Sequence, residues 1–137
     1  MNVHHVAYLT KNIERKADEL CRLWGAKRLG EPVVDPGQGA RILFLDLGGT
    51  RLELIEPWGD DSPVATRAKK SPGLYHLCFE VDDLEATLAG LEAAEEATVI
   101  KPPQPAPAIG NRRVAFVVTT GNDLVEFLER APKESAL

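Results

Sequence analysis

The feature that most constrains the fold of this chain is an internal repeat. The stretch "HHVAYLTKNIE" near the start is echoed by "YHLCFEVDDLE", with the aligned histidines His5 and His76 lying 71 positions apart. Each stretch places a histidine at the head of an apolar run that breaks at Asn or Asp and enters a helical pattern. Self-similarity at a fixed spacing indicates one structural unit used twice. With 137 residues, the chain is predicted to form a single domain of two small halves that share a core.

The same order of elements is predicted in both halves: a strand, a helix, a loop and two further strands. In the first half these are a strand at 3–10, a helix at 12–24, a Gly/Pro-rich loop, and strands at 40–48 and 50–57. In the second half they are a strand at 74–81, a helix at 83–94, the Pro-rich loop "KPPQPAPAIGN", and strands at 112–120 and 123–130. We therefore predict an α+β fold with a curved mixed sheet.

Local signals mark the ends of these elements. Asn12 is a predicted N-cap of the first helix, and Asp82 or Asp83 of the second. The turns "GG" at 48–49 and "GN" at 121–122 fall between the last two strands of each half, as in hairpins. The predicted organisation is module one at 1–57, a polar linker or short helix at 58–73, and module two at 74–130.

Composition and charge exclude several classes of function. The chain has 16 Lys and Arg against 21 Asp and Glu, a net charge of −5 with the acidic residues spread along the sequence. A nucleic-acid-binding surface needs a basic patch, so no nucleic acid is expected as a partner. No signal peptide and no apolar run of about 20 residues are seen, so no membrane is expected. Cys21 and Cys78 are interpreted as reduced thiols of a cytoplasmic protein.

Two histidines and two glutamates recur at matching places in the repeat. His5 and His76 stand on the first strands, and Glu53 and Glu126 stand on the last strands, 73 positions apart. Because strand residues alternate faces, the larger apolar sets pack under the helices and these four residues face the other side of the sheet. Considered on its own, each glutamate is typical of a strand residue that faces solvent. Each histidine, considered on its own, is typical of a hydrogen-bonded residue at the surface or at the boundary of the core. Four polar residues in register favour a metal site instead. His4 points to the opposite face from His5 and is interpreted as structural.

The chain resembles the vicinal oxygen chelate (glyoxalase/bleomycin resistance/dioxygenase) superfamily, and within it most closely methylmalonyl-CoA epimerases and the glyoxalase I group. The resemblance covers about residues 3–129 and rests on the two repeated stretches, on "QGARILFLDLGGTRLELIEPWGDDSPVA", and on "RRVAFV" and "LVEFLE". It implies two βαβββ modules around a divalent metal, with His5, Glu53, His76 and Glu126 as ligands.

The sequence departs from the epimerase pattern at three places. Pro36 and Gly37 stand where epimerases carry acidic residues, one of them an acid/base group. Tyr75 replaces a second histidine, and "VTTGN" lacks an "HP" dipeptide. Epimerases often carry Gln at the position of Glu53, whereas glyoxalase I commonly carries Glu. The departures concern the substrate and leave the ligand set intact.

Two imidazoles and two carboxylates suit a borderline divalent ion such as Co, Ni, Zn or Mn. Such an ion favours reactions through an enolate, in which a base removes a proton next to a carbonyl. Glu53 and Glu126 are the candidate catalytic bases. Asp35 is a third candidate, although the "DPG" sequence is also explained as a simple turn.

We therefore expect a metal-dependent epimerase or isomerase acting on a small acyl thioester or α-oxo substrate. Its carrier would be coenzyme A or glutathione, bound by the doublet Lys69–Lys70 or Arg112–Arg113 unless these are solvated surface charges. The alternatives are a lactoylglutathione lyase-like enzyme, an Fe(II) ring-cleaving dioxygenase, and a metal-free binding or resistance protein. A homodimer is expected from the family and from exposed edge strands.

Overall fold

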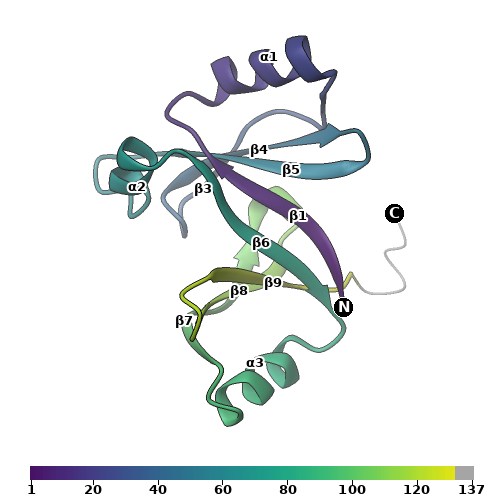
Figure 1. Cartoon of the computed structure of the whole chain (residues 1–137), viewed down its shortest axis with the longest axis vertical. Helices are drawn as coiled ribbons and strands as arrows, with labels where there is room; N and C mark the ends of the chain where they lie inside the picture. Colours follow the sequence, from purple (N-terminus) through teal and green to yellow (C-terminus); the bar gives the residue numbers. More distant parts are fainter. Residues whose placement is uncertain (132–137) are drawn as a thin grey trace. The chain divides into compact units, whose positions relative to one another are not determined.

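The computed structural model describes residues 1–131, and these residues form an α+β protein with nine strands and three α-helices. They fall into two compact units, drawn in Figure 1. The N-terminal unit is His5–Tyr75, and the C-terminal unit is Met1–His4 together with the residues from His76 onward. Each unit carries one copy of the predicted repeat, and β1 (Asn2–Leu9) and β6 (Gly73–Val81) both run across the boundary.

The N-terminal unit is built on the antiparallel pair β4 (Ala40–Leu47) and β5 (Thr50–Pro57). β1 runs parallel to β5, and the short strands β2 (Lys27–Arg28) and β3 (Val33–Asp35) pair with the other edge of β4. The predicted hairpin turn is confirmed, because Gly48 and Gly49 both have positive φ, as a two-residue turn of this hand requires.

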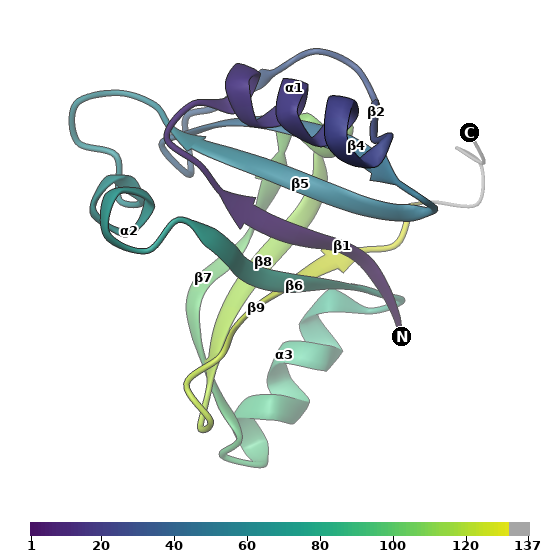
Figure 2. The ribbon, with the colours of Figure 1, turned by 45° about the horizontal axis from the view of Figure 1, so that its top comes forward.

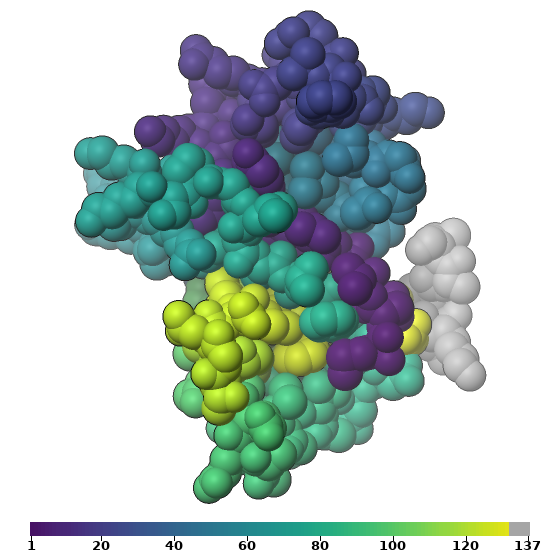
Figure 3. Space-filling view, in the orientation of Figure 1, coloured from purple at the N-terminus to yellow at the C-terminus, as the bar shows by residue number. Residues whose placement is uncertain are grey.

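One face of this small sheet is covered by α1 (Ile13–Trp24), which packs on β4 and β5 (Figure 2). The buried residues between them include Ile13, Ala17, Leu43, Leu45, Leu52 and Leu54, of which Leu52 and Leu54 lie on the side of β5 opposite Glu53, as strand alternation predicts. The outer side of α1 forms one part of the surface of the unit, seen as dark purple atoms in Figure 3. The helix begins at the predicted cap, since Asn12 accepts a hydrogen bond from the Arg15 amide. A second α-helix, α2 (Ala65–Lys70), lies in the predicted linker and packs on β5.

The C-terminal unit repeats this plan. β6 runs parallel to β9 (Leu124–Glu129), which pairs with β8 (Arg112–Thr119), and β8 pairs with β7 (Ala97–Ala106). The helix α3 (Leu84–Ala93) packs on β7 and β9, and Asp83 caps it by accepting from the Ala86 amide. A 3-10 helix, η1 (Pro107–Ile109), joins β7 to β8.

The prediction of a loop at 101–111 is wrong over most of that range. Its first six residues belong to β7, despite the three prolines Pro102, Pro103 and Pro105. Proline has no N–H to give to a ladder, but it is tolerated on edge strands and at bulges. β7 pairs with β8 alone in this unit, and its register shifts twice, between Val99 and Lys101 and between Lys101 and Gln104. The Gly/Pro-rich loop of the first half likewise contains the short strands β2 and β3.

The helix-covered faces of the two units differ in how completely they are filled. In the N-terminal unit Lys16 lies over the Tyr8 ring, 5.5 Å from its centre, and is held by Glu19 at 2.8 Å. The equivalent positions in α3 are Thr87 and Gly90, whose side chains are smaller. There, an open pocket of about 480 Å³ remains, lined mainly by apolar groups such as Phe79, Leu91 and Phe127.

The helices are all short or polar. None of those in residues 1–131 is long and apolar enough to cross a bilayer.

Candidate metal centre

The N-terminal unit contains a buried histidine–glutamate pair on adjacent strands. His5 is on β1 and Glu53 on β5, where Glu53 stands beside Ala7 in the parallel register. The two side chains are 0% and 2% exposed, and the His5 Nε2 lies 3.4 Å from the Glu53 Oε1. Neither His5 nor Glu53 is therefore a solvent-facing strand residue. A carboxylate removed from water in this way needs a proton, a donor or a cation beside it.

The C-terminal unit contains the same pair. His76 on β6 and Glu126 on β9 are 5% and 1% exposed, and the His76 Nε2 lies 3.1 Å from the Glu126 Oε1. Glu126 stands opposite Cys78 in the parallel register, two residues beyond the histidine, just as Glu53 stands opposite Ala7. In both units, therefore, strand alternation places the histidine and the glutamate of the repeat on the same face and next to each other.

Each pair is completed by a phenylalanine that sequence reasoning missed. Phe44 on β4 stands opposite Glu53 and packs edge-on against the His5 ring at 5.1 Å between centres. Phe116 on β8 stands opposite Glu126 and packs edge-on against the His76 ring at 5.3 Å. Edge-to-face packing fixes the orientation of an imidazole without using its nitrogens. The signal for these residues was present, since "ILFLDL" and "VAFVVT" carry Phe at matching places of the repeat.

The spacing within each pair fits two chemical states. Without an ion, His76 and Glu126 share a hydrogen bond of 3.1 Å, whereas the His5 Nε2 and the Glu53 Oε1 lie within ion-pair distance at 3.4 Å and form no hydrogen bond. With an ion, two ligand atoms each about 2.1 Å from a common centre lie about 3.0–3.4 Å apart at angles of about 90–109°. The donor set within either unit is therefore suited to divalent-ion binding.

Asp35 is placed differently from the four repeated residues. It ends β3 and is 3% exposed, and both carboxylate oxygens accept from Gln38, one from the backbone amide at 3.3 Å and one from the side-chain amide at 2.8 Å. The Asp35 carbonyl accepts from the same backbone amide. These contacts favour the turn-forming interpretation of "DPG".

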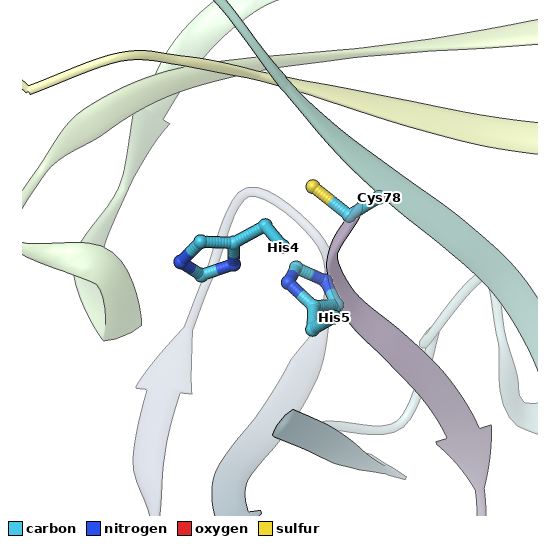
Figure 4. A group of neighbouring side chains, drawn as sticks. All are labelled: His4, His5 and Cys78. Carbon is cyan, nitrogen blue, oxygen red and sulfur yellow. The ribbon is translucent and has the colours of Figure 1, made fainter. Parts of the chain in front are cut away.

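A second group of potential ligands occurs on β1 and β6. Figure 4 shows His4 and His5 leaving consecutive positions of β1 and Cys78 leaving β6. Within the C-terminal unit, one ligand atom of half-buried His4 and the sulfur of buried Cys78 lie within 4.8 Å. This histidine lies outside the repeat, since Tyr75 occupies the matching place in the second half.

The two cationic doublets of the sequence have different environments. Arg112 forms an ion pair with Glu80 and donates to the Glu129 carbonyl at 3.0 Å, and Arg113 lies 2.6 Å from both Glu85 and Glu129. Arg112 and Arg113 are thus engaged in structural ion pairs. Lys69 and Lys70 are exposed on α2, and neither has an ion-pair partner among residues 1–131.

The comparison with protein families matches this chain over residues 4–116 to the Glyoxalase/Bleomycin resistance protein/Dioxygenase superfamily. The chain belongs to this superfamily. The resemblance seen in the sequence is thereby confirmed, together with the α+β fold of repeated modules. Members of the superfamily bind divalent metal ions, in keeping with the donor sets described above.

The most similar relatives and structures include several epimerases. The chain is 36% identical over 110 residues to methylmalonyl-CoA epimerase, mitochondrial, of Dictyostelium discoideum, an alignment covering 79% of this chain and 63% of that protein. It is 34% identical over 94 residues to the ethylmalonyl-CoA/methylmalonyl-CoA epimerase of Cereibacter sphaeroides, covering 67% and 69%. The crystal structure of methylmalonyl-CoA epimerase from Mycobacterium tuberculosis shares the fold, with a TM-score of 0.83, 23% identity, and coverage of 98% and 91%. The alignments span about half to two thirds of the length of most of these curated relatives.

Proposed function

We propose that this protein is a divalent-metal-dependent epimerase that acts by enolate formation on a small acyl-CoA thioester, in the manner of a methylmalonyl-CoA epimerase. The observation that carries the proposal is the buried histidine–glutamate pair repeated in both units. The names of the relatives add the reaction and the carrier. Because the relatives match over only part of their length, activity and substrate are part of the proposal.

The proposed ligand set is His5, Glu53, His76 and Glu126. Two neutral imidazoles and two carboxylates balance the charge of a borderline ion such as Co, Ni, Zn or Mn. When bound, the ion supplies Lewis-acid stabilisation for negative charge that builds up on a carbonyl oxygen. The edge-on contacts of Phe44 and Phe116 hold the two imidazole rings in place and keep water from one side of each.

The two glutamates are the proposed bases. Epimerisation requires that the proton next to the carbonyl leave from one face and return to the other. Glu53 and Glu126 come from equivalent strands of a repeated unit, so they are suited to opposite faces of one carbon. Each carboxylate lies beside an imidazole Nε2, at 3.4 and 3.1 Å.

The test is epimerisation of a single stereoisomer of methylmalonyl-CoA by the purified full chain, with metal content measured in the same sample. We expect conversion to the mixture of isomers, deuterium at the reacting carbon in deuterated water, loss of activity with a chelator, and recovery when Co²⁺, Ni²⁺, Zn²⁺ or Mn²⁺ is added. A full metal complement without exchange of that proton would contradict the proposal.

The same samples separate the alternatives. Turnover of a glutathione hemithioacetal in place of the thioester would assign a lactoylglutathione lyase-like reaction. Bound iron with oxygen uptake would assign the ring-cleaving dioxygenase, and tight ligand binding with no metal would assign the binding or resistance protein.

The proposal also includes a homodimer in the cytoplasm. The outer edge of β7, which pairs with β8 alone in its unit, is a surface that a second copy could cover. Within the described residues neither Cys21 nor Cys78 forms a disulfide, as suits a reducing compartment. Sedimentation at micromolar concentration should give the mass of two chains, and the mass of one chain would remove the dimer.

A further inference from the structure

We propose that α2 binds the phosphate groups of a nucleotide carrier, so that Arg67, Lys69 and Lys70 select coenzyme A thioesters over carriers without phosphates. This inference rests on the proposed function, because it assigns the part of the substrate that lies away from the reacting carbon. It concerns a surface of the N-terminal unit for which the fold itself gives no role.

The charge around α2 is opposite to that of the chain as a whole. The chain has a net charge of −5, yet residues 62–79 contain no Asp or Glu and include the three cations of α2. All three cations lie in the last turn of α2, where the helix dipole favours positive charge, although Arg67 and Lys70, three residues apart, repel each other. A cluster of this kind is favourable when an anion lies against it.

The packing of α2 presents these cations to solvent. Ala68 is 1% exposed and is the buried residue of the helix, whereas Arg67, Lys69 and Lys70 are all exposed. None of the three has an ion-pair partner among residues 1–131. The other doublet, Arg112 and Arg113, is held by Glu80, Glu85 and Glu129. Of the two doublets that the sequence offers for binding the carrier, Lys69–Lys70 is therefore favoured, because the arginines of the other doublet are engaged in ion pairs.

Two contacts connect α2 with the strands that bear candidate ligands. The helix packs on β5, the strand of Glu53. The Arg67 guanidinium also lies over the Tyr75 ring, 5.2 Å from its centre, and Tyr75 directly precedes His76 in the sequence.

The chemistry of the carriers distinguishes them at such a surface. Coenzyme A carries a pyrophosphate and a ribose phosphate, whereas glutathione has two carboxylates offset by an ammonium group. Three cations on one short helix match the clustered charge of the phosphates, and each exposed contact contributes modestly and is weakened by salt.

The experiment measures binding of free coenzyme A and of pantetheine, which lacks the phosphates, to the full chain by calorimetry. We expect coenzyme A to bind more tightly than pantetheine, and the difference to shrink at high salt. The double variant K69Q/K70Q should weaken coenzyme A binding about tenfold, from two contacts of about 0.5–1 kcal/mol each, and leave pantetheine unchanged. Adding R67Q should weaken it further.

The matched control is K11Q/K27Q, which removes the same charge from two exposed lysines flanking α1 in the same unit. It should leave coenzyme A binding unchanged. Equal affinity for coenzyme A and pantetheine, or equal weakening by both double variants, would overturn the inference. Because no thioester is turned over in this assay, its outcome is separate from that of the epimerase test. A chain that binds coenzyme A through α2 but epimerises nothing would fail only the proposed function.

Discussion

At the scale of single residues, a buried histidine that lies between a glutamate and a phenylalanine is best explained by the ligand it can hold. His5 and His76 are both in this situation, in separate units of the fold. We predict that His5→Ala and His76→Ala each lower the metal content of the purified protein severely, because a change outside the ligand shell alone typically weakens binding about 10–100-fold. Metal analysis and circular dichroism of the same samples measure content and folding.

The control for the histidine variants is His4→Ala. His4 is half-buried and lies outside the repeat, so this variant should keep its metal. Unchanged metal in the His5 and His76 variants, with metal lost in the His4 variant, would show that the repeated histidines are structural and that the ion is held elsewhere.

The glutamates are assigned two roles, metal ligand and catalytic base, and replacing each of them with glutamine distinguishes between these roles. An amide oxygen can still bind an ion but does not serve as a base, so Glu126→Gln should retain substantial metal and lose turnover by about 10²–10⁴-fold. Glu53→Gln should be milder, since epimerases often carry Gln at this place. Turnover and proton exchange in deuterated water are measured for both. Full epimerisation by both variants would rule out these bases and return attention to Asp35 or to bound water.

Sequence alone located the histidines and glutamates because strand alternation is a strict rule and the repeat applies it twice. Phe44 and Phe116 were missed although they recur at matching places of the repeat, because a phenylalanine in an apolar strand is also typical of an ordinary core residue. Only the register, which sets each phenylalanine opposite a glutamate, reveals its contact with a histidine. Register depends on pairing partners that are distant in sequence.

At the scale of elements, α3 contains a glycine without a local reason for it. Gly90 lies in the helix interior, and a Cβ built there meets no atom within 4 Å. Glycine costs about 0.8–1 kcal/mol relative to alanine in a helix interior. We predict that Gly90→Ala stabilises the protein by about that amount, measured by urea unfolding.

Gly39→Ala is the opposing control. Gly39 has φ of +60°, and a Cβ there would lie 2.8 Å from the Pro63 Cδ. This variant should be destabilised, because an L side chain is strained in this conformation and also meets its neighbour. Equal effects of the two substitutions would show that helix propensity and local space do not govern these positions.

The error over β7 also belongs to this scale. Three prolines within four residues argue for a loop when neighbours are unknown, since proline disrupts a central strand. In the edge strand β7, Pro102 and Pro103 fall within the register shift between Lys101 and Gln104, where the ladder is interrupted, and Pro105 stands in register with Arg113. Helix ends were predicted more successfully, because the caps Asn12 and Asp83 act within three residues of themselves.

At the scale of the whole molecule, Glu80 joins parts of the chain that are far apart in sequence. It pairs with Arg112, accepts from Asn2 at 3.4 Å, and lies 3.5 Å from Arg130. Burial by itself raises the pKa of Glu80, but the hydrogen bonds from Arg112 and Asn2 and the charges of Arg112 and Arg130 outweigh it and lower the pKa below 4.5. A depressed carboxyl pKa stabilises the fold at pH values above the ordinary one, and this contribution is lost as pH falls through the lowered value.

We predict that Glu80→Gln destabilises the protein by about 1 kcal/mol at pH 7, as expected for a partly buried charge-assisted contact. The difference from the unmodified chain should shrink as the pH falls below 4.5, the ordinary pKa of the group. Urea unfolding of both proteins across this range provides the measurement. A difference that stayed constant down to pH 3 would mean that the amide is disfavoured for its shape and that the charge of Glu80 is immaterial.

The path of β1 affects the order in which the two units can fold during synthesis. Its residues up to His4 belong to the C-terminal unit, while the rest of the strand pairs with β5 in the other. On the ribosome, β1 and β5 are both available once residue 57 has emerged, so this pairing can form early. Asn2, however, precedes its partner Glu80 by 78 positions and Arg130 by 128. Translation therefore delivers one end of the C-terminal unit first and its other end last, and that unit closes only when almost the whole described chain has been synthesised.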